Sequence, residues 1–504
     1  MIILLRMFLE ELLEDGHRFF QPWDSYDDLN YYLHMFASWV CIFLSMTLPV
    51  KAFLGLSYRE SLRFTLLFFP VILTVPAIDF LATGGAGARI VYAQELSLFA
   101  DYFLGMLNPF QTLPLVTPGV RCEILAVTAG SFLLALFPFR RGLLRSILLA
   151  VSIYLSIFFY GFLPSLVEAL GVNLEKFAEF SATGVIRSQR FAFIYLWLFF
   201  VLSAAAGWVL FREDRARVRA VASLAFPSRS LHYLLLLVFG FLYAAQAGAI
   251  YGRLLNGADV SKLAMALVSI FLLFVHAKIT NDMNDLTIDR ISNPGRPLVS
   301  GVLTTTAAGS LGRLAWGAGW VAALMTAKIF ICCWLALWAA SHVYSAPPFR
   351  LRRFYPAGHL TLAAIGSLVF LAGTMLALGD GAYNRISEKA IFVYVFLAFF
   401  CLCHLKDFKD MEGDRAAGVG NILARLRWPR LAGVAAIWGY CLFVGLIAER
   451  LRLNLLPAVV LFGTAGTAYV LRVQEPARID RLIPLSLLLL SALAIAFFAA
   501  YGSP

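Results

Sequence analysis

The chain has 504 residues, of which 61% are hydrophobic and 14% are charged, and its mean hydropathy is +0.80. Soluble proteins keep about a quarter of their residues charged, so this composition excludes a soluble globular protein and indicates an integral membrane protein. Apolar segments of about 18 or more residues recur, which favours membrane-spanning helices over a β-barrel. The net charge of +11 does not indicate nucleic-acid binding, because multi-pass membrane proteins concentrate Lys and Arg in cytoplasmic loops.

The first twenty residues combine an apolar run with charged residues, beginning with Arg6 and Glu10. They contain no small-residue cleavage site, so we expect an amphipathic helix at the membrane surface and not a signal peptide. Five or six spans should follow. They are predicted at residues 32–54, 62–81, 90–107 (the optional one), 124–139, 143–163 and 191–211.

Residues 211–230 form the densest charged run in the chain and are predicted to be a linker. We therefore expect an N-terminal multi-pass membrane domain at residues 1–220 and a second domain at 221–504. The second domain should contain nine spans. They are predicted at residues 231–251, 262–280, 305–325, 328–344, 359–378, 390–405, 431–448, 455–471 and 482–500. Most Lys and Arg of this half lie in the linker and in the loops after spans two, four, six and eight, which predicts that these loops face the cytoplasm.

Two groups of aspartates lie at the ends of predicted spans. Asp282, Asp285 and Asp289 follow span two with spacings of three and four, which would place their carboxylates on one face of a continuing helix. Residues 407–414 repeat the same spacing after span six, with Asp407, Asp410 and Asp414. Four crossings separate the groups, so both must emerge on the same side of the membrane.

Six like charges next to membrane spans would repel one another unless a cation is bound, although a solvated loop is the simplest alternative. Carboxylates suit a hard divalent cation, and Mg²⁺ is usually held by one or two carboxylates together with substrate phosphates. Two facing carboxylate arms therefore predict a clamp for Mg²⁺ and a diphosphate. Basic residues near the arms, including Arg296, Arg350 and Lys406, would neutralise the remaining phosphate charge.

These motifs resemble the UbiA superfamily of intramembrane polyprenyl (aromatic) prenyltransferases. The first signature is "NDMNDLTID" at 281–289, with "NPGRP" at 293–297; the second is "KDFKDMEGDR" at 406–415, and "YSAPPFRLRR" at 344–353 matches a third. The resemblance covers roughly residues 222–504 and implies a nine-helix prenyltransferase bundle preceded by an additional membrane domain of unknown role.

The resemblance implies a Mg²⁺-dependent enzyme that moves a polyprenyl group from an allylic diphosphate to an aromatic or other lipophilic acceptor. It implies six metal ligands, namely Asp282, Asp285, Asp289, Asp407, Asp410 and Asp414. It implies five catalytic residues, namely Asp285, Asp289, Asp410, Asp414 and Tyr344. It implies four substrate contacts, namely Asn281, Arg296, Arg350 and Lys406.

Two alternatives remain at this point. A polytopic transporter would use the acids to bind cations or protons, but transporters usually place such acids near the middle of the bilayer. A noncatalytic scaffold would leave the N-terminal domain as the working part. The sequence leaves open the acceptor, the prenyl chain length and the oligomeric state.

Overall fold

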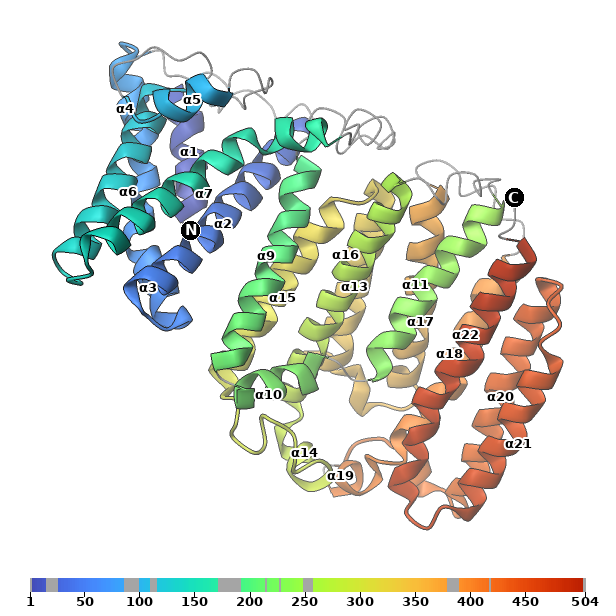
Figure 1. Ribbon diagram of the computed structural model, residues 1–504. Coiled ribbons are helices and arrows are strands. Elements are labelled where there is room, and N and C mark those ends of the chain that lie inside the picture. The colour runs from blue at the N-terminus through green and yellow to red at the C-terminus, as the bar shows by residue number, and fades with distance from the viewer. Residues whose placement is uncertain are drawn as a thin grey trace. The chain divides into compact units, whose positions relative to one another are not determined.

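The computed structural model describes residues 2–14, 26–85, 99–108, 116–170, 192–213, 215–225, 228–247, 257–378, 389–416 and 418–501 (Figure 1). Within these ranges the regular elements are all helices. Nine of the described helical segments are long and apolar enough to cross a membrane. The prediction of an all-helical, multi-pass membrane protein is confirmed. Its contacts divide the chain into two compact units, Met1–Arg215 and Ala216–Pro504.

The N-terminal unit is built from helices of very different length. They are α1 (Ile2–Glu14), α2 (Tyr26–Leu54), α3 (Tyr58–Phe68), η1 (Phe69–Leu73), α4 (Thr74–Ala82), α5 (Phe99–Gly105), α6 (Pro118–Leu136), α7 (Leu143–Ala169) and α9 (Ala192–Glu213). Helices α3, η1 and α4 together form one candidate span, Tyr58–Ala82. Of the optional span at 90–107, only residues 99–107, which include α5, lie within the described residues.

Helix α1 buries its charged face, whereas the expected helix at the membrane surface would expose that face. Arg6 is fully buried and Glu10 is 5% exposed, whereas Leu4 and Phe8 are exposed. The helix packs against η1 and α4. An apolar outer face and a charged inner face are typical of a helix in contact with lipid, because ionisable groups in a bilayer turn toward the protein interior.

The C-terminal unit contains nine long helices among the residues that the structure describes, and each corresponds to one predicted span. They are α11 (Ser228–Ala247), α13 (Gly257–Asn284), α15 (Thr305–Leu324), α16 (Lys328–Ser345), α17 (Ala357–Leu378), α18 (Ala390–Asp407), α20 (Pro429–Arg450), α21 (Leu456–Arg472) and α22 (Leu482–Tyr501). The short helix α10 (Arg215–Ala225) precedes them.

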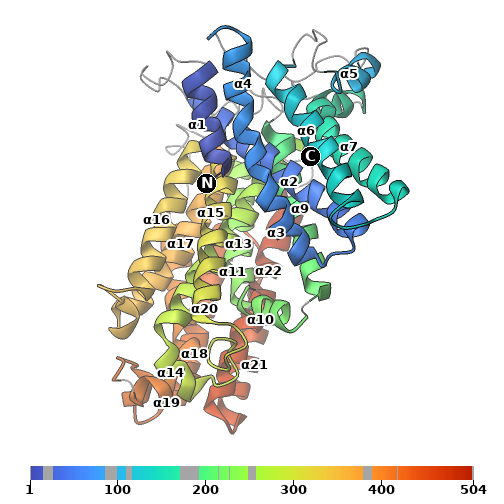
Figure 2. The same cartoon turned by 90° about the vertical axis from the view of Figure 1, so that its left-hand side faces the viewer.

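Two short helices follow the ends of α13 and α18. They are α14 (Leu286–Ser292) and α19 (Met411–Ala416). Four long helices separate them in sequence, so the chain returns to the same end of the bundle, where α14 and α19 contact each other (Figures 1 and 2).

Helices α11 and α17 form a close pair in the core of this unit because two glycines lie at their contact. A Cβ on Gly240 would clash with the backbone oxygen of Phe370, and one on Gly373 would clash with the backbone oxygen of Leu237. Such reciprocal small-residue contacts let two membrane helices approach backbone to backbone.

We predict that Gly373→Ala lowers the melting temperature of the detergent-solubilised protein. The added methyl group must push α11 away, and overpacking of this kind costs about 1–3 kcal/mol. Gly445→Ala on α20 is the matched control, since a Cβ there meets no atom within 4 Å. Because Ala favours a helix over Gly, the control should leave the melting temperature unchanged or raise it. Equal effects of the two substitutions would contradict the close α11–α17 contact.

Candidate functional site

The first aspartate arm lies where α13 ends and α14 begins. Asp282 belongs to the last turn of α13, Asp289 belongs to α14, and Asp285 lies at the break between them with φ −105° and ψ 12°. The continuous helix predicted from the spacing is therefore interrupted. All three side chains are nevertheless buried, at 1%, 2% and 1% exposure for Asp282, Asp285 and Asp289.

The second aspartate arm lies between α18 and the start of α20. Asp410 and Asp414 are each 5% exposed, and Asn421 donates a hydrogen bond of 3.0 Å from Nδ2 to Asp414 Oδ2. Asp407 has a partner of its own, since its Oδ2 lies 3.1 Å from Nε2 of His359 on α17. All three acids of this arm line one small pocket.

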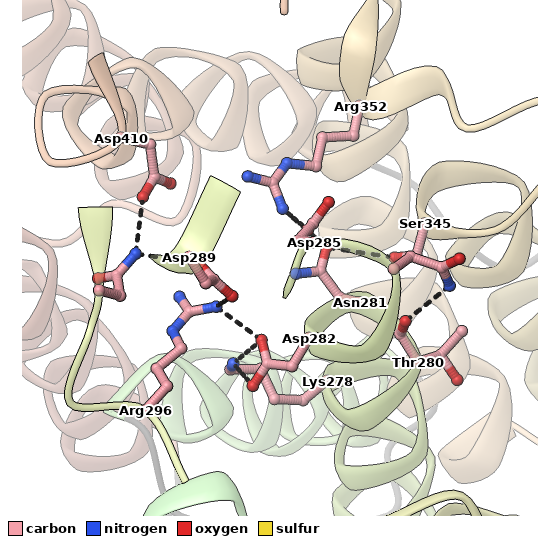
Figure 3. A network of polar contacts seen from close by, with 12 residues as sticks. Lys278, Thr280, Asn281, Asp282, Asp285, Asp289, Arg296, Ser345, Arg352 and Asp410 are labelled. Carbon is pink, nitrogen blue, oxygen red and sulfur yellow. Dashed lines mark hydrogen bonds and ion pairs between the residues drawn. The ribbon is translucent and has the colours of Figure 1, made fainter. Parts of the chain in front are cut away.

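The two arms meet through side chains that contact both. Asn293 donates from Nδ2 to Asp289 Oδ1 at 3.1 Å and to Asp410 Oδ1 at 3.5 Å. Arg352 pairs with Asp285, and its Nη2 lies 3.9 Å from Asp414 Oδ1. Figure 3 shows Asp410 above the Asp289 side of the network and Arg352 extending to Asp285 from the same upper side of the view. The arms therefore lie close enough to contact one ligand.

A backbone contact also joins the arms. The amide N–H of Gly413 donates to Ser292 Oγ at 3.1 Å. A Cβ at position 413 would clash with that same hydroxyl oxygen, so glycine permits α14 and α19 to approach this closely.

Four cations neutralise the acids of the first arm. Lys278 pairs with Asp282, and Arg296 bridges Asp282 (2.8 Å) and Asp289. Arg350 Nη2 lies 3.0 Å from Asp285 Oδ1, and Arg352 pairs with the other oxygen of this carboxylate, Oδ2. Buried carboxylates require such partners, since an uncompensated buried charge costs several kcal/mol.

Sequence reasoning missed three residues of this network: Lys278, Asn293 and His359. Lys278 lies inside an apolar span, one helical turn before Asp282, and that i,i+4 position was the signal available. Asn293 is the first residue of the "NPGRP" motif at 293–297, but the motif by itself does not predict its contacts. Nothing in the sequence singles out His359, because its contact with Asp407 depends on how α17 crosses α18.

A cavity of about 340 Å³ extends from the arms into the bundle. Helices α11, α13, α16, α17, α18 and α22 contribute its walls. Its polar end includes Lys278, Asn281, Arg296, Arg352, Lys406 and Asp410. Its apolar end includes Ile270, Phe274, Leu337, Ile365, Val369 and Phe399. This shape suits a ligand with an anionic head and an apolar tail.

Tyr344 lies between these two ends of the cavity. Its hydroxyl accepts a hydrogen bond of 2.8 Å from Lys406 Nζ, and that ammonium lies 5.4 Å from the centre of the tyrosine ring. Asn281 accepts at Oδ1 from Ser345 Oγ (3.5 Å) and from Arg352 Nη1 (3.4 Å). The two uncharged polar residues predicted at the site thus both line the cavity next to a cation.

Burial disfavours the charged forms of two of these acids. It raises the pKa of Asp414 to about 6, although the hydrogen bond from Asn421 and the charge of Arg352 act in the opposite direction. Burial also raises the pKa of Asp289, against the charge of Arg296. A bound cation would favour both charged forms.

The donor set fits a hard divalent cation that is shared with a ligand. Among the described residues, no three His, Cys, Asp or Glu side chains are close enough to hold a metal ion by themselves. Asp414 Oδ1 is buried without a hydrogen-bond donor, so an acceptor oxygen is available in the second arm. Mg²⁺ usually completes a small set of carboxylates with water and phosphate oxygens.

Comparison with curated proteins finds prenyl-transferring relatives. A digeranylgeranylglyceryl phosphate synthase from Methanoculleus marisnigri is 27% identical over 206 residues, which are 40% of this chain and 70% of that protein. The same enzyme from Methanocaldococcus jannaschii is 26% identical over 35% of this chain and 60% of its own length. A probable homogentisate phytyltransferase 2 from Oryza sativa subsp. japonica is 29% identical over 29% of this chain and 40% of its own length.

Solved structures of similar proteins include a UbiA homologue from Aeropyrum pernix K1, at 20% identity and a TM-score of 0.41 over 52% of this chain and 97% of that one. Another is a UbiA homologue from Archaeoglobus fulgidus bound to GPP and Mg²⁺, at 18% identity and a TM-score of 0.38 over 56% of this chain and 100% of that one.

The profile of the UbiA prenyltransferase family matches residues 234–489, which are just over half of the chain and include both aspartate arms and all the cavity-lining residues except His232 and Tyr233. The chain therefore belongs to the UbiA prenyltransferase family.

Proposed function

We propose that this prenyltransferase binds a polyprenyl diphosphate with its headgroup between the two aspartate arms and its tail in the cavity, and transfers the prenyl group to a lipophilic acceptor. The observation that carries this proposal is the meeting of the arms, through Asn293 and Arg352, at the polar end of an apolar cavity. A diphosphate headgroup and an isoprenoid tail match these two environments.

The six aspartates are the proposed Mg²⁺ ligands, with Asp285, Asp289, Asp410 and Asp414 nearest to the contact between the arms. When bound, Mg²⁺ neutralises the diphosphate and acts as a Lewis acid on the leaving group. The guanidinium groups of Arg296, Arg350 and Arg352 now contact carboxylates, and each can form two parallel hydrogen bonds with phosphate oxygens. Lys406 and Asn281 are proposed to contact the same headgroup from the cavity wall.

The apolar end of the cavity would protect the allylic cation that forms when diphosphate leaves. Phe274 and Phe399 line it, and aromatic faces attract cations. Tyr344, the proposed catalytic aromatic residue, lies beside Lys406, where head and tail of the donor would join. Exclusion of water prevents hydrolysis of the cation to an alcohol, so the acceptor becomes the nucleophile.

The acceptor is proposed to be lipophilic because the cavity is lined largely by apolar side chains. The names of the relatives include enzymes for a glyceryl phosphate lipid and for homogentisate, which is aromatic. Both acceptor classes remain part of the proposal. We also propose, from the distribution of Lys and Arg, that the aspartate arms face the cytoplasm.

The transporter and scaffold alternatives receive less support. The acids lie at the ends of α13 and α18 and beyond, and not at the middle of a span. A scaffold would not require four cations and five carboxylates, all largely buried, around a cavity.

We predict that Asp285→Asn and Asp410→Asn each lower the rate of diphosphate release from a labelled allylic diphosphate at least about a hundredfold. Each substitution removes one charged ligand from a buried, charge-balanced site while keeping the side-chain shape. The assay uses the full chain in lipid nanodiscs with Mg²⁺. Addition of a chelator should abolish the activity of the unsubstituted protein as well.

Glu412→Gln is the matched control for these variants. Glu412 lies on α19 between Asp410 and Asp414 in sequence but is exposed, so its substitution should leave the rate within about twofold, as surface changes usually do. Retention of activity in Asp285→Asn and Asp410→Asn would rule out the proposed role of the arms.

We predict that Val369→Phe restricts the length of the donor. Ile270 lies eleven residues before Asn281 on α13, which corresponds to about 16 Å of depth at 1.5 Å per residue. Val369 is 2% exposed and lines the same deep end. A phenyl ring there should lower turnover of a long polyprenyl diphosphate at least tenfold more than turnover of a short one.

The control for this prediction is Val393→Phe, because Val393 on α18 is 55% exposed. The ratio of long-chain to short-chain turnover, measured with two donors on each variant, should be unchanged there. If Val369→Phe slowed both donors equally, the prenyl tail would not occupy this end of the cavity.

A further inference from the structure

The N-terminal unit also contains a group of buried charges, which the proposed prenyl transfer does not use. Arg6, Glu10, Asp79, Arg121 and Glu123 are between 0% and 7% exposed and come from α1, α4 and α6. Buried ionisable groups in membrane helices are expensive and commonly mark a functional site.

Four of these five residues have partners within the unit. Asp79 Oδ1 accepts a hydrogen bond of 2.6 Å from the Gly119 amide, and Arg121 Nη1 donates to the Asn108 carbonyl at 3.3 Å. Arg6 Nη1 lies 3.7 Å from Glu10 Oε2, with the Arg6 guanidinium 5.8 Å from the Trp39 ring centre. The Asp79 contact joins α4 to α6, and the Arg6 contact with Trp39 joins α1 to α2.

Glu123 is different: it interacts electrostatically with Arg6, but no hydrogen bond or close ion pair joins its carboxylate to a residue that the structure describes. It is 7% exposed and lines a cavity of about 150 Å³ enclosed by α2, α3, η1, α6 and α7. The other cavity-lining residues are mainly apolar, among them Ile42, Val50, Phe69 and Ile153. A buried carboxylate facing an apolar cavity is costly unless a bound molecule supplies a hydrogen-bond donor.

Two further polar groups that line this cavity have no hydrogen-bond partner. Trp39 Nε1 and Thr65 Oγ1 are buried without one, and their residues are 8% and 5% exposed. The cavity therefore offers an acceptor at Glu123, a donor at Trp39, and a hydroxyl at Thr65 that can do either. A few polar groups in an apolar pocket are typical of a small-molecule site, where they orient the ligand.

We propose that this cavity binds a lipophilic molecule that carries a hydroxyl group on a body about the size of one aromatic ring. A hydroxyl group both donates and accepts, so it matches this combination of polar groups. A dry cavity of about 150 Å³ accommodates one benzene ring, which sets the size of the bound portion. A neutral hydroxyl also enters from the bilayer at lower cost than a cationic amine.

The cavity can be reached from the outside of this unit. Phe68 and Ala126 line it and are also exposed, Phe68 to 46%. The proposal requires neither the aspartate arms nor prenyl transfer, so each can fail independently of the other.

The test compares two photoreactive probes on the full chain in nanodiscs: a para-diazirinyl phenol and the matching para-diazirinyl toluene, which differ in one hydroxyl group. Cross-linked peptides are located by mass spectrometry. We expect the phenol probe to label peptides of α2, α3 and α6, and excess unlabelled phenol to suppress this labelling. In Glu123→Leu, the part of the phenol-probe labelling that excess phenol suppresses should fall about tenfold or more, because the hydrogen bond to a charged acceptor is lost. Labelling by the toluene probe should be unchanged.

Gly130→Phe is a second variant, designed to fill the cavity. A Cβ at Gly130 meets no atom within 4 Å, so a large side chain can be built there. It should remove labelling by both probes, and a cooperative melting transition like that of the unsubstituted protein reports that both variants are folded. Labelling that is absent, survives Gly130→Phe, or responds to Glu123→Leu equally with both probes would overturn the proposal.

Discussion

Charge pairing between Arg352 and the two aspartate arms is the interaction on which the site depends. Arg352 lies in η3 (Leu351–Arg353), between α16 and α17, and it pairs with Asp285 while approaching Asp414. Since each carboxylate is buried, separating the arms would expose or orphan a charge at a cost of several kcal/mol. The ends of α13, α16 and α18 are therefore held together at one end of the bundle, and the cavity lies directly between the helices that they terminate.

Much of the fold could be predicted from the sequence because membrane helices are defined by long apolar runs. The nine helices of the C-terminal unit, and the return of α14 and α19 to the same end, follow from span lengths and the parity of crossings. The local geometry of the arms could not be predicted in the same way. A spacing of three and four residues is compatible with a continuous helix, yet the chain breaks at Asp285, and the break lets Asp285 meet Arg350 and Arg352 from a distant segment.

The contacts of individual residues could not be predicted for the same reason, since they depend on segments that are distant in the sequence. Asp407 occupies the expected place in the motif, but the crossing of α17 and α18 brings His359 within 3.1 Å of it. Helix α1 is amphipathic as expected, yet composition does not distinguish a helix on the membrane surface from one that turns its charged face toward other helices. The burial of Arg6 follows from contacts with η1 and α4, which no local pattern contains.

The proposed chemistry explains why the site contains so many cations. Lys278, Arg296, Arg350 and Arg352 lie beside four buried carboxylates, those of Asp282, Asp285, Asp289 and Asp414. Asp410 adds a fifth, so the site is close to charge balance. A diphosphate bound with Mg²⁺ would add little net charge, because the metal would offset most of the phosphate charge. In the proposed complex the carboxylates would hold the metal and the guanidinium groups would bind phosphate oxygens. The buried charges would then be paired with or without the ligand, which a site built from aspartates alone could not achieve.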